Sequence, residues 1–169
     1  MTVYSPSSSV RSLNDEYKDI IPEMLKHLRY SQIEKLSKKY DLRPGMGLAA
    51  PQLGINKNFF VVCYEVKDGV FDDYILINPK VISYSEEMIY AGEGEGCLSV
   101  NREVEGIVPR HARITVEAYD LDGNKRKYRV REDLAIAFQH ELDHLNGVLF
   151  VDYIDPKDPY KDAELYREI

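Results

Sequence analysis

The feature that most constrains the fold is a succession of short apolar runs separated by turn residues, which begins after Pro51. The runs cover residues 59–66, 74–77, 81–84, 114–118 and 128–130, and Asp68-Gly69, Asn78-Pro79 and Asp122-Gly123 stand at turns between them. The last two runs alternate apolar and polar residues, which is typical of a hairpin. The sequence therefore predicts an antiparallel sheet over this part of the chain.

Two other stretches have the apolar intervals of helices. One follows Pro22, a residue suited to a first helical turn, and continues until about Asp41. The other, at residues 132–146, is rich in good helix formers, has acids in its first turn and meets Gly147 at its end. Together these patterns predict an α+β fold, with antiparallel sheets packed around a central helix that carries the HELDH sequence of residues 140–144.

The chain has 169 residues, a length that suits one compact domain, so we expect residues 1–169 to form a single domain. Residues 1–12 have no apolar periodicity and are expected to be frayed, and residues 152–169 are expected to form an acidic C-terminal tail. The longest apolar run is too short to cross a bilayer, and the N-terminus lacks a signal pattern. A cytoplasmic protein is therefore expected.

The net charge of −7 argues against a polyanionic partner. The 22 basic residues are spread along the chain, a distribution that disfavours sequence-independent binding of nucleic acid. The substrate is therefore not expected to be a polyanion.

His140 and His144 stand four residues apart within the predicted central helix. This spacing places both imidazoles on one helix face, where they can chelate one metal ion. Glu141 then points toward the same site and can act as general acid and base. The alternative is a pair of ordinary surface histidines, because this motif also arises by chance.

A catalytic metal site needs a third protein ligand, and Cys97 is the natural candidate. It follows a glycine-rich stretch at residues 92–96, where the backbone can approach a ligand closely. The alternative interpretation of these glycines is a flexible hairpin loop. Their spacing could also suggest a phosphate site, but no following helix or lysine supplies the rest of such a site. Cys63 lies in an apolar strand and is expected in the core.

Three segments resemble the signature motifs of peptide deformylases, in the order found in that family. They are GMGLAAPQ at residues 45–52, EGCLS at residues 95–99 and QHELDHLNG at residues 139–147. The stretch GEGEGCLSVNREV is similar to the subgroup common in Gram-positive bacteria. The resemblance implies a hydrolase that removes the N-formyl group from the N-terminal methionine of newly synthesised proteins and releases formate.

The resemblance also implies the metal centre. Cys97, His140 and His144 would bind one divalent ion and Glu141 would transfer protons, in agreement with the reading of the residues themselves. Fe(2+) is expected physiologically, with Zn(2+), Ni(2+) or Co(2+) possible in the purified protein.

The substrate site follows from the same matching of motifs. Gln52 and the backbone amide of Leu98 would donate to the formyl oxygen, and Gly47 would pair with the substrate backbone. Met46 and Ile136 would line the pocket for the methionine side chain.

Charged residues near the motifs are candidates to orient the ligands, with solvated surface charge as the alternative. These are Glu95, Arg110 and Asp143, whereas His27 and His111 match no motif and are expected at the surface.

The expected partners are N-formylmethionyl nascent peptides, without a membrane and without direct specific binding of nucleic acid. Some family members use a basic C-terminal helix at the ribosome, but residues 152–169 hold six acids and three bases, so any transient ribosome contact would use another surface. Two rival functions stay open: an endopeptidase of the His-Glu-x-x-His type, and a catalytically silent module that binds peptide N-termini.

Overall fold

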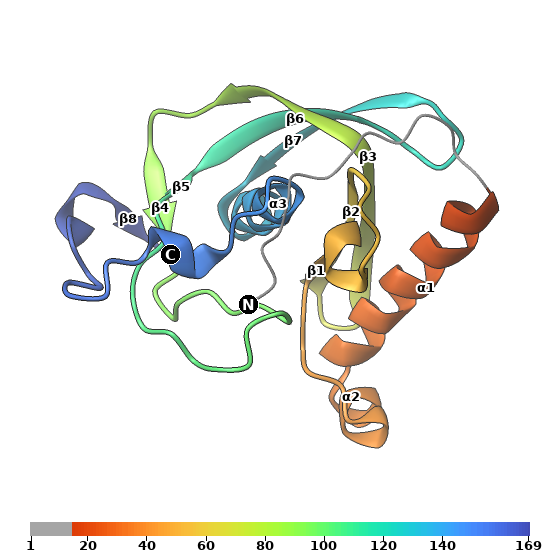
Figure 1. The fold of residues 1–169 in the computed structure, drawn as a ribbon, viewed down its shortest axis with the longest axis horizontal. Coiled ribbons are helices and arrows are strands. Elements are labelled where there is room, and N and C mark those ends of the chain that lie inside the picture. Colours follow the sequence, from red (N-terminus) through yellow and green to blue (C-terminus); the bar gives the residue numbers. More distant parts are fainter. Residues whose placement is uncertain (1–14) are drawn as a thin grey trace.

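The computed structural model describes residues 15–169, so the expectation of a frayed segment at residues 1–12 lies outside the described part. Two helices come first, most of the strands follow, and the helix with the HELDH sequence comes after them (Figure 1). The elements are α1 Asp15–Gln32, α2 Glu34–Tyr40, β1 Gly47–Ala49, η1 Ala50–Leu53, β2 Phe59–Lys67, β3 Val70–Tyr84, β4 Met88–Tyr90, β5 Arg110–His111, β6 Arg113–Tyr119, β7 Lys125–Arg131, α3 Glu132–Leu145, η2 Phe150–Tyr153, η3 Ala163–Leu165 and β8 Arg167–Glu168.

The strands form two sheets. The larger sheet has the order β1-β2-β3-β6-β7 with every neighbouring pair antiparallel, and the smaller has the order β5-β4-β8. In the smaller sheet β4 pairs antiparallel with β5 and parallel with β8. The predicted α+β class with antiparallel sheets is confirmed, whereas the parallel β4–β8 pair was not foreseen. Within residues 15–169, no helix combines the length and the apolar character that a membrane crossing requires.

Helices cover both faces of the larger sheet, and β2 shows why. Phe59, Val61 and Cys63 belong to the core cluster built with α1, whereas Phe60 and Val62 belong to the cluster built with α3. All five side chains are fully buried, as the continuous apolar sequence of a strand covered on both faces requires. The prediction that Cys63 is a core residue is thereby confirmed. The helix α3 contacts β1, β2, β5, β6 and β7.

Three predicted boundaries were wrong. The first helix begins before Pro22, and Ile33 adopts an extended conformation that separates α1 from α2. The predicted turn at Asn78-Pro79 lies inside the continuous strand β3, where Asn78 has a φ of 50° and the register with β6 shifts between Ile77 and Lys80. This irregularity sets Pro79, which has no N–H, outside the ladder.

The turns at Asp68-Gly69 and Asp122-Gly123 are as predicted. Gly69 and Gly123 adopt φ values of 74° and 79°, which a residue with a side chain rarely adopts. The Asp120 carboxylate accepts hydrogen bonds from the backbone N–H groups of Asp122 and Asn124, so this segment is a plain turn.

The closing segment folds back onto the domain. Residue Ile89 of β4 pairs with Arg167 of β8, and the Arg167 guanidinium forms ion pairs with Glu87 and Glu132. The end of the acidic stretch 152–169 is therefore held against β4 and the start of α3.

Candidate metal centre and substrate pocket

Three residues with metal-binding side chains meet between α3 and the segment that follows β4. The α-helical spacing places His140 and His144 on one face of α3, with ring centroids 5.1 Å apart. Cys97 approaches from the loop between β4 and β5, and its Sγ lies 3.2 Å from His144 Nε2. One ligand atom from each of the three residues lies within 4.8 Å of the other two, so the chain brings the predicted ligand set together.

The surroundings of Cys97 favour the thiolate, which is the form that binds metals. Burial alone would raise the pKa of the thiol, but hydrogen bonds with His140 and His144 outweigh burial and lower the pKa to about 5. The backbone N–H of Ser99 also donates to the sulfur, at 3.4 Å. A thiolate with two imidazoles is a donor set that suits Fe(II) and Zn(II). The residues present therefore fit a catalytic ion with one coordination position left open.

Glu141 lies beside the three ligands and is almost completely buried. Burial raises the pKa of its carboxyl group to about 7, and no described residue forms a hydrogen bond with its Oε2. A carboxyl group with this pKa can both accept and return a proton near neutral pH.

Gly47 in β1 leaves the space that the Glu141 carboxylate occupies. A Cβ atom at position 47 would lie 2.4 Å from Glu141 Oε1, a distance at which one of the two groups must move. The first motif therefore contributes a glycine whose neighbour is the proposed proton carrier.

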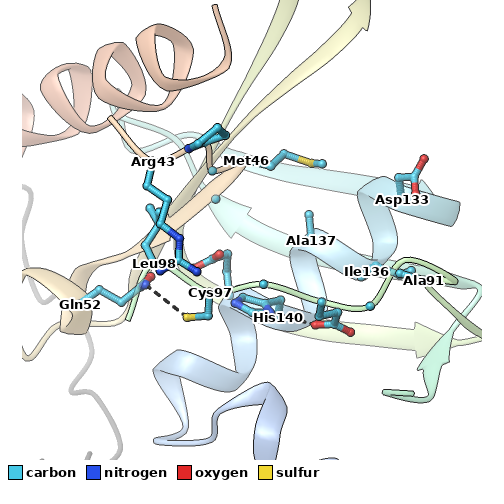
Figure 2. Close-up of a pocket in the computed structure, with 17 residues that line it drawn as sticks. Arg43, Met46, Gln52, Ala91, Cys97, Leu98, Asp133, Ile136, Ala137 and His140 are labelled. Atoms are coloured by element: carbon cyan, nitrogen blue, oxygen red, sulfur yellow. Dashed lines mark hydrogen bonds and ion pairs between the residues drawn. The ribbon is translucent and has the colours of Figure 1, made fainter. Parts of the chain in front are cut away.

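Gln52 has one end held by the backbone and the other end turned toward the site. Its Oε1 accepts a hydrogen bond of 2.8 Å from the Ala49 N–H, and its Nε2 donates to Ser99 Oγ at 3.0 Å. Nε2 also lies 3.9 Å from Cys97 Sγ (Figure 2). The donor end of the Gln52 amide thus faces the metal ligands. The side chain of Leu98, the residue after Cys97, packs over Gly45.

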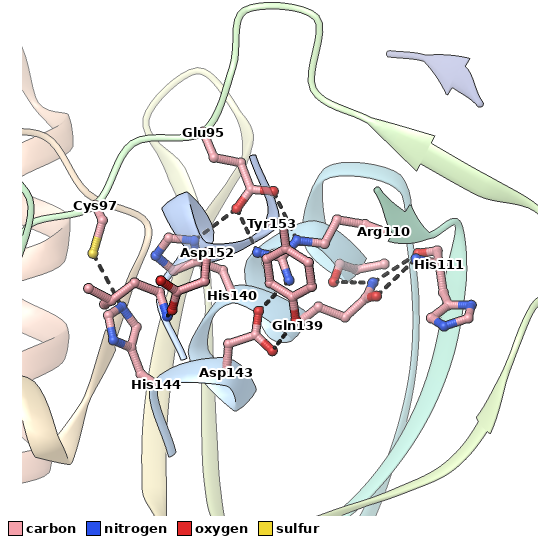
Figure 3. A network of polar contacts seen from close by, with 12 residues as sticks. Glu95, Cys97, Arg110, His111, Gln139, His140, Asp143, His144, Asp152 and Tyr153 are labelled. Carbon is pink, nitrogen blue, oxygen red and sulfur yellow. Dashed lines mark hydrogen bonds and ion pairs between the residues drawn. The ribbon is translucent and has the colours of Figure 1, made fainter. Parts of the chain in front are cut away.

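A polar network fixes the orientation of His140. The His140 Nδ1–H donates to Glu95 Oε1 at 2.9 Å, and Arg110 binds both oxygens of Glu95 at 2.8 and 2.9 Å (Figure 3). Arg110 also binds Asp143, whose other oxygen accepts a hydrogen bond from the Tyr153 hydroxyl.

The same network leaves Glu95 charged although it is buried. Burial opposes the carboxylate form, yet hydrogen bonds with His140 and Arg110 lower the pKa of Glu95 below its usual value. The Arg110 and Glu95 side chains are only 3% and 5% exposed, so the alternative of solvated surface charge is wrong for both.

The roles of two residues near the metal centre, Gln139 and His111, were not predicted from the sequence. The Gln139 side-chain amide exchanges two hydrogen bonds with the backbone of His111, each 2.9 Å long, and ties α3 to β5. His111 was expected at the surface but is half-buried, with its Nδ1 2.7 Å from the Ser85 carbonyl oxygen. His27 is exposed, as expected.

A cavity of about 310 Å³ opens beside the three ligands. Figure 2 shows Gln52 and Cys97 at one end and Asp133 and Ile136 at the other. Its lining contains the predicted residues Met46, Gly47, Gln52, Cys97, Leu98, Ile136, His140 and Glu141, together with Arg43, Pro44, Gly45, Ala91, Gly94, Glu95, Gly96, Asp133 and Ala137. His144 does not contribute to the lining. The positions of Arg43 and Asp133 in the cavity wall were not predicted from the sequence, because neither residue belongs to a motif.

Comparisons with known proteins agree with this geometry. The family model described as polypeptide deformylase matches residues 2–160. A peptide deformylase of Oceanobacillus iheyensis is 47% identical over 152 residues, which cover 90% of this chain and 83% of that protein. The protein named peptide deformylase 2 of Bacillus subtilis is 46% identical over 150 residues, covering 89% and 82%.

Solved structures show the same likeness. The crystal structure of peptide deformylase from Thermotoga maritima has a TM-score of 0.70 and 33% identity, and the match covers 91% of each chain. That of the peptide deformylase from Thermus thermophilus has a TM-score of 0.74 and 29% identity, covering 93% of this chain and 82% of the other. The resemblance inferred from the three motifs is therefore confirmed, and the chain belongs to the polypeptide deformylase family.

Proposed function

We propose that this chain removes the N-formyl group from the N-terminal methionine of newly synthesised proteins and releases formate, using the site built by Cys97, His140, His144 and Glu141. The observation that best supports this proposal is that the three ligand atoms lie within 4.8 Å of one another, beside the buried Glu141 carboxyl group and an open cavity. The family and its named relatives support the same activity.

The metal ion would be held by Cys97, His140 and His144, with Glu95 and Arg110 keeping the His140 ring in place. A bound divalent ion supplies Lewis acidity toward the formyl oxygen and toward water. We expect Fe(2+) in the cell and Zn(2+), Ni(2+) or Co(2+) in some preparations, because a thiolate and two imidazoles accept each of these ions.

Glu141 would carry the proton of the hydrolysis. Its carboxylate removes a proton from the attacking water as the new C–O bond forms on the formyl carbon, and returns it to the nitrogen as the C–N bond breaks. The products are formate and a peptide with a free N-terminal amine.

Gln52 would stabilise the negative charge that develops on the formyl oxygen. Because the Ala49 N–H holds Gln52 Oε1, the Nε2 donor is directed toward the ligands before a substrate arrives. The Leu98 backbone amide would act as a second donor. A donor that is positioned in advance is worth about 3–4 kcal/mol of transition-state stabilisation.

The substrate would bind along the edge of β1. This strand pairs with β2 on one side only, so Gly47 can offer its backbone to an extended peptide on the other side. Met46 and Ile136 line the cavity next to this edge and would contact the methionine side chain.

A formate-release assay tests the proposal and separates it from its rivals. Formyl-Met-Ala-Ser should release formate, whereas acetyl-Met-Ala-Ser and longer blocked peptides should stay intact. Cleavage of an internal peptide bond would favour an endopeptidase. Binding of the formylated peptide without formate release by the iron-loaded protein would favour a silent peptide-binding module.

A further inference from the structure

We infer that the outer face of the β6–β7 hairpin is a docking surface for the phosphate backbone of structured RNA. Strand β7 has the sequence KRKYRVR, with five basic residues among seven, and it forms one edge of the larger sheet. These residues take no part in the cavity or in the metal centre.

Strand alternation gathers most of these charges on one face. Val130 and Tyr128 point into the core cluster shared with α3, so Lys125, Lys127, Arg129 and Arg131 point to the opposite face. The pairing with β6 sets Arg113 beside Arg131, Thr115 beside Arg129, Glu117 beside Lys127 and Tyr119 beside Lys125. Lys80 of β3 stands beside Glu117 and extends the same face.

This basic face is defined as Lys80, Arg113, Lys125, Lys127, Arg129 and Arg131. All six residues are exposed. Among the paired residues of β6 and β7, Glu117 is the one carboxylate on the same face. Glu117 lies 3.6 Å from Lys125 and 3.8 Å from Lys127, and Glu87 pairs with Arg113. Arg129 and Arg131 form no ion pair with any residue between 15 and 169. A concentration of positive charge therefore stands out on a protein whose net charge is −7.

The shape of the face suits a nucleic-acid backbone. Four cations at every second position of β7 form a row about 20 Å long, because each strand residue advances ~3.3–3.4 Å. A row of this length can face several successive phosphates. Tyr119 is 39% exposed beside Lys125 and offers a ring on which a base or sugar can rest.

The basic face and the cavity lie on different sides of the larger sheet. Helix α1 packs on the same side of the sheet against β1, β2 and β3, and Leu121 at the tip of the β6–β7 hairpin packs against its core cluster, whereas the six residues of the basic face are exposed. The cavity lies on the α3 side and at the β1 edge. RNA bound to the basic face would not cover the entrance that a peptide must use.

RNA is the partner that this surface and the proposed function favour together. Newly made peptides leave the ribosome, whose surface carries folded RNA, and contacts with phosphates would concentrate the enzyme there without reading bases. The spread of basic residues along the sequence argued against such binding, but the folded sheet collects them.

An edge strand can also carry charge merely to prevent pairing with another sheet. The triple substitution Lys127→Glu, Arg129→Glu and Arg131→Glu separates the two explanations, because it keeps the edge charged and reverses the sign. A matched control, Lys26→Glu, Lys35→Glu and Lys39→Glu, makes the same change of net charge at exposed positions of α1 and α2. Deformylation of formyl-Met-Ala-Ser by the iron-loaded variants verifies that the fold is retained.

The measurement is the Kd for a labelled 20-base-pair RNA duplex as a function of salt, together with cosedimentation with purified 70S ribosomes. The β7 variant should bind RNA at least about tenfold more weakly than the control, and the slope of log Kd against log salt should fall by about 2–3. Three results would overturn the inference: no RNA binding by the parent at low salt, equal loss in both variants, or an unchanged Kd in the β7 variant. Binding to anionic phospholipid vesicles is measured in the same way. If the β7 variant loses binding to the vesicles but keeps its Kd for RNA, the basic face is a membrane-binding surface instead.

Discussion

At the scale of single residues, the contact between Gly47 and Glu141 couples the first motif to the third. Because a Cβ at position 47 would meet Glu141 Oε1 at 2.4 Å, Gly47→Ala should displace the carboxylate and lower kcat/KM by about 10²-fold with the fold retained. Gly45→Ala is the control, since its Cβ meets the flexible end of Leu98 at 2.9 Å and Leu98 can rotate away. Equal losses in the two variants, measured with a formyl-peptide, would show that the Glu141 contact has no special effect.

The two cysteines should respond differently to substitution. Cys97→Ala removes a proposed ligand and should lower metal content sharply, whereas Cys63→Ala removes a buried side chain and should cost about 1–2 kcal/mol of stability with metal retained. Burial raises the pKa of Cys63 to about 11, so this thiol should also resist alkylation at pH 8. Metal analysis and melting curves of both variants check the prediction. Full metal occupancy in Cys97→Ala would remove Cys97 from the ligand set.

At the scale of elements, much of the arrangement follows from sequence patterns. The β6–β7 hairpin and α3 were predicted because alternation and helix-end signals agree there. The break at Ile33 was missed because apolar spacing continues across it, and the parallel β4–β8 pair was missed because strands of two or three residues leave no periodic signal.

The candidate site divides in the same way. The spacing of His140 and His144 reports their common helix face, so sequence suffices for that pair. Glu95 and Asp143 lie within motifs and Arg110 lies outside them, but no pattern in the sequence pairs the three, because their network depends on β5 packing against α3. The contact of Gly47 with Glu141 and the pairing of Gln139 with His111 likewise exist only after β1 and β5 are placed.

The network between β5, α3 and the Cys97 loop should tune the metal centre. Glu95→Gln keeps the shape of the side chain but removes the charge that holds His140 and Arg110, so metal affinity should fall by about 10–100-fold. Glu87→Gln is the control, because Glu87 is an exposed partner of Arg113 and Arg167. Titration with a chelator measures both. An affinity unchanged by Glu95→Gln would limit the network to a packing role.

At the scale of the whole molecule, metal binding should be linked to stability, because the three ligands converge only in the folded chain. An ion present at about 1,000 times its Kd adds ~4 kcal/mol to the free energy of unfolding. In a chain of this size that free energy corresponds to a Tm difference on the order of 10 °C. Chelation should therefore lower the Tm by that amount and added Fe(2+) should restore it. A Tm independent of metal would show that the folded chain binds the ion no more tightly than the unfolded chain does.

The proposed hydrolysis depends most directly on Glu141 as the proton carrier beside the metal ligands. Glu141→Gln keeps the size of the side chain but cannot shuttle a proton, so kcat and kcat/KM should both fall by about 10²- to 10⁴-fold. Metal content and Tm, measured on the same preparation, should stay near those of the parent. A folded variant with full metal content and a kcat close to that of the parent would contradict the account.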